Sequence, residues 1–218
     1  MKKMIHSIYV AAGFILCQIC LLWWSLRDVI DPPKTDSVLF VAHPDDDTLF
    51  FHQYIKEKKP YVCLMTTGWS MRRLPCFFKA MKYYGVRYRA YPMGARDKRI
   101  QLLKKHTDTV LRLASFPVVA VHNAEGEYGH EEHIRVHDAV VEQCRRSGKE
   151  HVLYCPAKKF EIANYPLLPE VIQEKKYIFN NIYTTEKWVL DEEAAGTPIW
   201  VVNEKLKEFI QNEGNHGS

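Results

Sequence analysis

Two short clusters of histidine and carboxylate residues give this sequence the means to bind a metal ion. Residues 42–47 read Ala-His-Pro-Asp-Asp-Asp, and residues 125–133 read Glu-Gly-Glu-Tyr-Gly-His-Glu-Glu-His. A plain helix cap would need one aspartate and no histidine. His130 and His133 are one helical turn apart, so they share a face of any helix that contains them. Each cluster alone is a weak signal, but together they provide enough imidazoles and carboxylates for one metal site.

The chemistry that such a site performs is hydrolysis. A catalytic zinc ion takes three protein ligands and keeps a fourth position open for water. Two imidazoles and one carboxylate satisfy that count, and a further carboxylate could accept a proton from the water. Iron(II) binds the same nitrogen and oxygen donors, so the residues predict Zn²⁺ with Fe²⁺ as an alternative.

Both clusters follow apolar runs that predict buried strands, at residues 37–43 and 117–122. Further strands are expected at 61–66, 88–92 and 151–156, with a late edge strand at 200–202. Helices are expected at 48–58, 73–84, 97–114 and 130–146, and over most of 169–190. This alternation predicts an α/β, Rossmann-like, mostly parallel sheet with helices on both faces. Ligands bind such sheets beyond the carboxyl ends of the strands, where both clusters fall.

The N-terminal part of the chain predicts a transmembrane helix. Residues 8–26 contain no charged side chain, and about 20 apolar residues suffice to cross a bilayer. Trp23 and Trp24 lie at one end, where indole rings prefer the headgroup boundary. A cleaved signal peptide is the competing interpretation, but no Ala-x-Ala pattern follows the run. A buried core helix is less favoured still, because the run has no polar face.

The predicted organisation is a tail (1–7), a single-pass anchor (8–26), a linker (27–36) and a catalytic domain (37–212). Lysines that precede the anchor favour a cytoplasmic N-terminus and an extracytoplasmic domain. Basic residues on the far side weaken that contrast, so the orientation stays open.

The composition excludes a nucleic-acid-binding protein and favours a single domain. The 218 residues include 30 basic and 26 acidic side chains, a net charge of +4 that is spread along the chain. Cys17 and Cys20 have CxxC spacing but lie in the apolar run, where a metal role is not expected. The other four cysteines are widely spaced and are expected to be buried thiols rather than disulfides.

The first cluster, from Ala42 to Asp46, resembles the signature of the PIG-L/LmbE-like N-acetylglucosaminyl deacetylases, and residues 128–133 resemble their second motif. Arg73, with Ala80 and Gly85 in the helix after it, also matches the family pattern. The resemblance covers roughly residues 37–155. It implies that His43, Asp46 and His133 hold the zinc ion and that Asp45 is the general base.

The resemblance also implies roles around the metal. His130 would stabilise the tetrahedral intermediate or protonate the leaving amine, with Glu132 holding it in its charged form. Tyr128 could donate a hydrogen bond to the developing oxyanion. The residues expected to contact substrate are Arg73, Trp69 and Asn123. Trp69 could equally be a core aromatic residue, and His122 could border the pocket beside Asn123.

Two positions depart from the family pattern. Asp47 replaces the usual glutamate, which keeps the charge but shortens its reach. Cys76 replaces a glutamate three residues after the arginine, which removes a charge and leaves the substrate in question. Arg72 could also take the role assigned to Arg73.

The resemblance therefore implies a hydrolase that releases acetate and a free amine from an N-acetylglucosaminyl conjugate. The predicted anchor adds the hypothesis that the substrate is linked to lipid or to the cell envelope. Two alternatives stay open: hydrolysis of a non-sugar amide, such as an antibiotic or thiol conjugate, and a catalytically inactive sugar-binding protein. The presence of all five central residues argues against the inactive protein. These residues are His43, Asp45, Asp46, His130 and His133.

Overall fold

The computed structural model describes residues 26–66, 71–91, 100–156, 168–190 and 206–209, together with Ile19, Leu22 and Trp23. Among these residues, no helix is both long enough and apolar enough to cross a membrane. Most of the predicted anchor at 8–26 lies outside the described residues, as does the expected strand at 200–202.

One sheet organises the described chain, with the strand order β3-β2-β1-β4-β5-β6. Its first five strands run parallel and the last is antiparallel to its neighbour. The strands are β1 (Ser37–Val41), β2 (Tyr61–Leu64), β3 (Tyr88–Ala90), β4 (Val118–Val121), β5 (Val152–Pro156) and β6 (Leu206–Phe209). The α/β class and the mostly parallel sheet are therefore confirmed.

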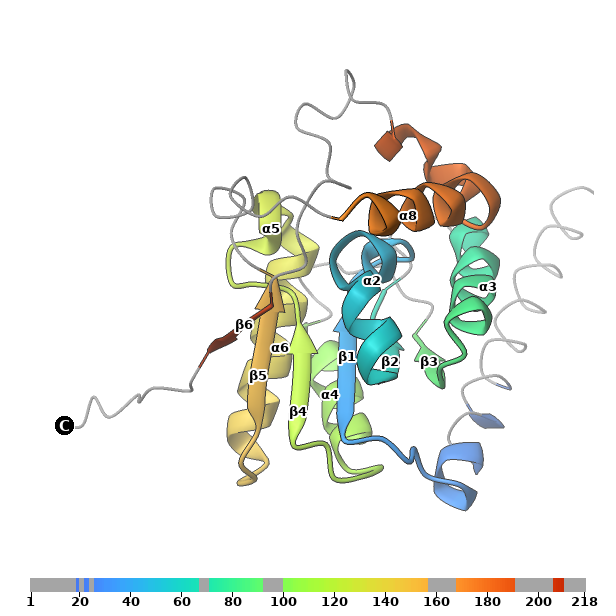
Figure 1. Cartoon of the computed structure of the whole chain (residues 1–218). Coiled ribbons are helices and arrows are strands. Elements are labelled where there is room, and N and C mark those ends of the chain that lie inside the picture. Colours follow the sequence, from blue (N-terminus) through green and yellow to red (C-terminus); the bar gives the residue numbers. More distant parts are fainter. Residues whose placement is uncertain are drawn as a thin grey trace, which may run out of the picture.

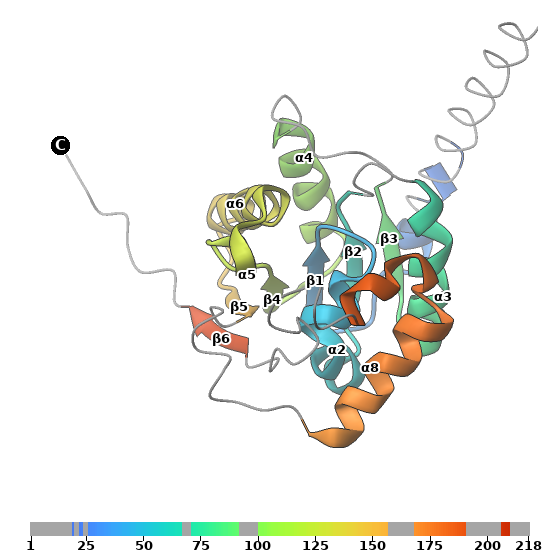
Figure 2. The same ribbon diagram turned by 90° about the horizontal axis from the view of Figure 1, so that it is seen from above.

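Helices cover both faces of this sheet (Figures 1 and 2). On one face lie α4 (Ile100–Leu111) and α6 (Glu131–Arg146), and on the other lie α2 (Asp46–Lys58), α3 (Leu74–Tyr84) and α8 (Pro169–Asn181). Alternate residues of β1 enter different cores: Leu39 packs with α2 and α3, whereas Phe40 packs with α4 and α6. Because both faces are covered, every residue of β1 and β2 is buried.

Short elements complete the described chain and adjust the expected boundaries. These are η1 (Met71–Arg73), α5 (Gly126–Gly129) and η3 (Thr184–Leu190). The first helix starts at Asp46, two residues earlier than expected, so it includes part of the first cluster. The helix expected over most of 169–190 ends at Asn181, and the 3₁₀ segment η3 follows it. The cysteines of the described chain are all thiols, as expected: Cys63, Cys76, Cys144 and Cys155.

Residues 26–30 form a helical turn that is bound to the domain at the amino end of the sheet. The buried carboxylate of Asp28 accepts a hydrogen bond from the Tyr61 hydroxyl at 2.6 Å. It also forms ion pairs with Arg27 (2.6 Å), Arg87 (3.1 Å) and Arg89 (3.5 Å). The first part of the segment expected to be a linker is thus packed onto the domain.

Candidate metal centre

The two clusters meet at the carboxyl ends of the parallel strands. The first follows β1 and the second follows β4, and these strands are parallel neighbours (Figure 1). From β1 the chain crosses to β2 on one side, whereas β4 lies on the other side, so the strand order reverses between β1 and β4. Open α/β sheets bind their ligands in the crevice at such a point.

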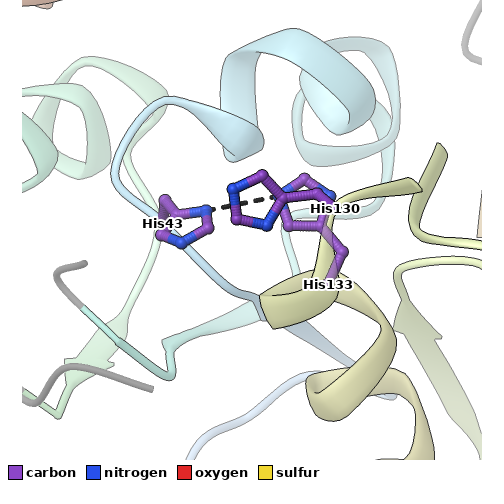
Figure 3. A group of neighbouring side chains, drawn as sticks. All are labelled: His43, His130 and His133. Carbon is purple, nitrogen blue, oxygen red and sulfur yellow. Dashed lines mark hydrogen bonds between the residues drawn. The ribbon is translucent and has the colours of Figure 1, made fainter. Parts of the chain in front are cut away.

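Three predicted ligands come together there. Nδ1 of His43 lies 3.3 Å from Nε2 of His133, and Oδ2 of Asp46 lies 3.4 Å from each of these nitrogens. Figure 3 shows the imidazoles of His43, His130 and His133 gathered from the two motifs, with a dashed line at the contact between His43 and His133. Tetrahedral zinc, with bonds of about 2.0–2.1 Å, needs donors separated by about 3.3–3.4 Å. The donors therefore have the spacing that a tetrahedral ion requires, and Fe²⁺ remains compatible with them.

Two further histidines are close enough to be considered as ligands. Besides His43, Asp46 and His133, two other possible metal-binding groups lie among the described residues: His43 with His130 and His133, and Asp46 with His122 and His133. The Nε2 atom of His122 accepts the backbone N–H of Ala42 at 2.9 Å, so its lone pair is already used. His122 therefore braces the end of β1. His130 caps α6, because its Nδ1 accepts the N–H of Glu132 at 3.2 Å.

The His43 imidazole contacts a carboxylate through the nitrogen that does not face the other two donors. Its Nε2 contacts Glu132, which leaves Nδ1 directed at the other two donors. Burial alone would lower the pKa of His43, but Asp46 and Glu132 raise it to about 9. A metal ion bound at Nδ1 would therefore displace a proton, so metal affinity should rise with pH.

The contact of Glu132 with His43 differs from the expected pairing of Glu132 with His130. The two residues are only two positions apart at the start of α6, so their side chains point to different sides. Burial, with the neighbouring His133 and His43, lowers the pKa of His130 to about 4. This lowered pKa favours the neutral imidazole of His130 over the charged form that Glu132 was expected to maintain.

Asp45 lies beside the three donors in a strained backbone conformation. Its φ of 108° is unusual for a residue other than glycine, and such strain is often found at functional sites. Its carboxylate is buried and accepts a hydrogen bond from Arg73 at 2.6 Å. Burial raises the pKa of Asp45, and the Arg73 guanidinium opposes that rise. A buried carboxylate that is held beside three possible metal donors is placed to act as a base.

Arg73, whose contact with substrate stays a prediction, is half-buried and binds other parts of the protein. Besides Asp45, it donates to the carbonyl of Pro44, and its Nε lies 2.9 Å from Oε1 of Glu186. Glu186 is buried in η3, and no sequence motif marked it. The carboxylate expected near the arginine, at the position of Cys76, is thus supplied from a distant part of the chain. Arg72 is exposed.

The side chain of Asp47 supports the backbone of Asp45 through a hydrogen bond. Its Oδ1 accepts the hydroxyl of Tyr183 at 2.6 Å and the backbone N–H of Asp45 at 3.2 Å, and its Oδ2 accepts the Thr48 hydroxyl at 3.0 Å. Burial raises the pKa of Asp47 to about 6, against the hydrogen bonds from Tyr183 and Thr48. The short side chain of Asp47 is therefore held by hydrogen bonds from three neighbouring groups.

Other predicted residues take different places. Tyr128 is 48% exposed, with its ring centroid 5.7 Å from that of His130, so it stands at the rim of the site. Asn123 is buried, and its Oδ1 accepts the backbone N–H groups of Glu125 and Glu127. Its side chain organises the loop, and its contact with substrate stays a prediction. Trp69 lies outside the described residues.

Glu127 is a site residue that the sequence did not single out. Its carboxylate is buried between His122 and His133. Burial alone would raise the pKa of Glu127, but the two imidazoles lower it to about 2. The second cluster contains four glutamates, and spacing alone could not tell which of them points inward.

The fold and the site define an α/β protein with a buried His/Asp cluster that can hold a divalent cation. The described chain superimposes on a crystal structure of Dbv21, the deacetylase of the antimicrobial A40926 pseudoaglycone, with a TM-score of 0.56. The match has 16% sequence identity and covers 76% of this chain and 88% of that one. A deacetylase triple mutant involved in teicoplanin biosynthesis, Orf2*T, gives a TM-score of 0.54 at 12% identity, with the same coverage. The chain therefore has the fold of the LmbE-like (PIG-L) deacetylases.

The comparisons of sequence carry less information. No family model matches the chain. Uncharacterized protein L374 of Acanthamoeba polyphaga mimivirus is 24% identical over 121 residues. That match covers 46% of this chain and 54% of the viral protein, so the chain matches about half of that relative's length.

Proposed function

We propose that this protein is a metal-dependent deacetylase of the LmbE type that hydrolyses the acetamide of an N-acetylglucosaminyl conjugate, releasing acetate and a free amine. One observation carries the proposal: His43, Asp46 and His133 place three donor atoms 3.3–3.4 Å apart, beside the buried carboxylate of Asp45. The shared fold of two deacetylases supports it.

The residues divide the chemistry as follows. A divalent cation held by His43, Asp46 and His133 would supply a polarised acetamide carbonyl and a more acidic water. Asp45 accepts a proton from the attacking water, and Arg73 keeps its carboxylate in position. Tyr128, at the rim, donates a hydrogen bond to the oxygen on which negative charge develops.

The departing amine requires one proton, and two groups can return it. Protonated Asp45 carries the proton taken from the water. His130 is neutral at rest, because its pKa is lowered to about 4, so it can act only after accepting that proton. Hydrolysis thus consumes one water and leaves no net proton on the protein.

The apolar segment at 8–26 supports a conjugate that is linked to lipid or to the envelope. In this proposal the segment is a single-pass anchor, and the leading lysines favour an extracytoplasmic catalytic domain. The partner is then an N-acetyl sugar conjugate at the membrane surface.

A second candidate is the hydrolysis of an amide on a glycopeptide-like antibiotic. It is favoured by the two similar structures, whose names refer to the A40926 pseudoaglycone and to teicoplanin biosynthesis. Both candidates use the same metal and the same base, so they differ only in the group that carries the amide.

Metal analysis of the purified full chain, paired with acetate release, tests the proposal. The substrates are soluble and lipid-linked N-acetylglucosaminides and an N-acylated glycopeptide. We expect about one zinc or iron per chain and acetate released from the lipid-linked sugar. Turnover of the glycopeptide alone would select the second candidate. A chain that binds no divalent metal, or binds it and hydrolyses none of the amides, would refute the proposed activity.

A further inference from the structure

A buried glutamate that the proposed hydrolysis does not use lies behind the candidate metal site. Glu127 is 6% exposed. Its Oε2 accepts hydrogen bonds from Nδ1–H of His133 at 2.6 Å and from Nδ1–H of His122 at 3.0 Å. Its Oε1 accepts the backbone N–H of Asn123 at 2.8 Å. Both oxygens are therefore occupied by donors of the protein itself.

The loop that carries Glu127 has two consecutive residues with positive φ, a conformation that strains any residue other than glycine. Glu127 has φ 57° and ψ −59°, and the residue before it, Gly126, has φ 66°. A Cβ atom at Gly126 would lie 2.9 Å from Cγ1 of Ile134, so the loop needs glycine to approach α6 this closely. Strain of this kind persists only where the surrounding structure enforces it. Here the strained residue is Glu127, the residue whose carboxylate lies between the imidazoles of His122 and His133.

The position of this carboxylate decides which nitrogen each imidazole can offer. A neutral imidazole carries one N–H, so a hydrogen on Nδ1 leaves the lone pair on Nε2. For His133, Nε2 is the atom that lies 3.3 Å from His43 and 3.4 Å from Asp46. For His122, Nε2 accepts the N–H of Ala42, directly before the first cluster. Through these two histidines, the Glu127 carboxylate thus influences residues of both clusters.

We propose that Glu127 is a positioning residue of the metal site. It fixes the Nδ1–H tautomer of His133, so that Nε2 is presented to a divalent cation. Through His122 it keeps the end of β1 in register with that nitrogen. The inference rests on the metal site of the proposed function, but not on its substrate or its reaction.

The first test measures zinc affinity of the full chain by competition with a chromophoric chelator. The Glu127→Gln variant keeps the shape of the side chain but has one acceptor oxygen for three donors. Loss of such a partner typically weakens metal binding about 10–100-fold. Glu127→Asp, which keeps the charge with a shorter reach, should lie between this variant and the wild type.

The matched control is Glu125→Gln, which makes the same change two residues earlier in the loop on an exposed side chain. It should bind zinc with the affinity of the wild type. A Glu127→Gln variant that folds and binds zinc as tightly as Glu125→Gln would overturn the proposal.

The second test needs no variant to fold. ¹⁵N-histidine spectra of the wild-type chain loaded with zinc report which ring nitrogen carries the hydrogen. His122 and His133 should both be protonated at Nδ1, whereas an Nε2–H on either one would overturn the proposal. Neither test uses a substrate, so a chain that binds zinc in this way but hydrolyses no amide would refute the proposed activity alone.

Discussion

Arg73 and Asp45 form an ion pair in which a nitrogen of the half-buried guanidinium lies 2.6 Å from an oxygen of the buried carboxylate. The pair joins the start of α3 to the loop after β1, two elements that are 28 residues apart in the chain. It orients the carboxylate that stands beside the three metal donors without belonging to them. In the proposed function Asp46 is a metal ligand and Asp45 is the base, and the contact of Asp45 with Arg73 distinguishes the two carboxylates.

The first prediction concerns that division. Asp45→Asn should keep the metal and lower the turnover number by about 10²–10⁴-fold, because the amide cannot accept a proton from water. The measurement is acetate release combined with metal content. Asp46→Asn is the matched control and should lose metal. Metal loss in Asp45→Asn with retention in Asp46→Asn would show that the two roles are exchanged.

The second prediction concerns the other partner of Arg73. Glu186→Gln removes the charge that holds Nε of the arginine at 2.9 Å, so the guanidinium should shift and carry Asp45 with it. We expect activity to fall about 10-fold while metal content stays unchanged.

Glu174→Gln is the control for Glu186→Gln, because Glu174 also lies in the C-terminal part but pairs with Lys56 on α2. Acetate release should stay near the wild-type rate in this variant. Equal activity in both variants would mean that Glu186 has no influence on the base.

The third prediction concerns the turn at residues 26–30. Asp28→Asn leaves three guanidinium groups without their shared buried carboxylate, which should lower the free energy of unfolding by about 3 kcal/mol. Asp31→Asn removes an exposed partner of Arg87 and should cost at most about 1 kcal/mol. Urea denaturation of the two variants compares them. Equal losses would indicate that the turn is not integral to the domain.

The fourth prediction concerns the pH dependence of stability. His52 is buried beside Tyr84 and Glu174, and burial, with Lys175, lowers its pKa from 6.5 to about 4. The unfolded chain therefore binds a proton between pH 6.5 and 4 that the folded chain does not. His52 thus makes stability fall as the pH drops through this range, by up to about 3 kcal/mol.

His52→Gln should flatten this acid limb relative to the wild type, as measured by urea denaturation at several pH values. The comparison must be made as a difference, because His106 has a pKa lowered in the same way. Tyr84→Phe, which keeps the imidazole, should retain the slope. An unchanged slope in His52→Gln would contradict the buried neutral state of His52.

The sequence by itself determined the parallel sheet and the candidate donors of the metal site. Both are local properties: strand and helix periods are written in consecutive residues, and each cluster lies directly after a strand. Because neighbouring parallel strands have their carboxyl ends on the same side of the sheet, the meeting of His43 and His133 follows from the topology.

Only the tertiary structure decided which partners hold those residues in place. Glu127 was one of four glutamates in its cluster, and Glu186 and Tyr183 come from a segment more than a hundred residues beyond the groups they contact. The contacts of Arg73 with Asp45 and Glu186 were likewise not predicted. These choices depend on how side chains from separate elements fill one buried space and satisfy each other's charges, and no local pattern in the chain encodes that geometry.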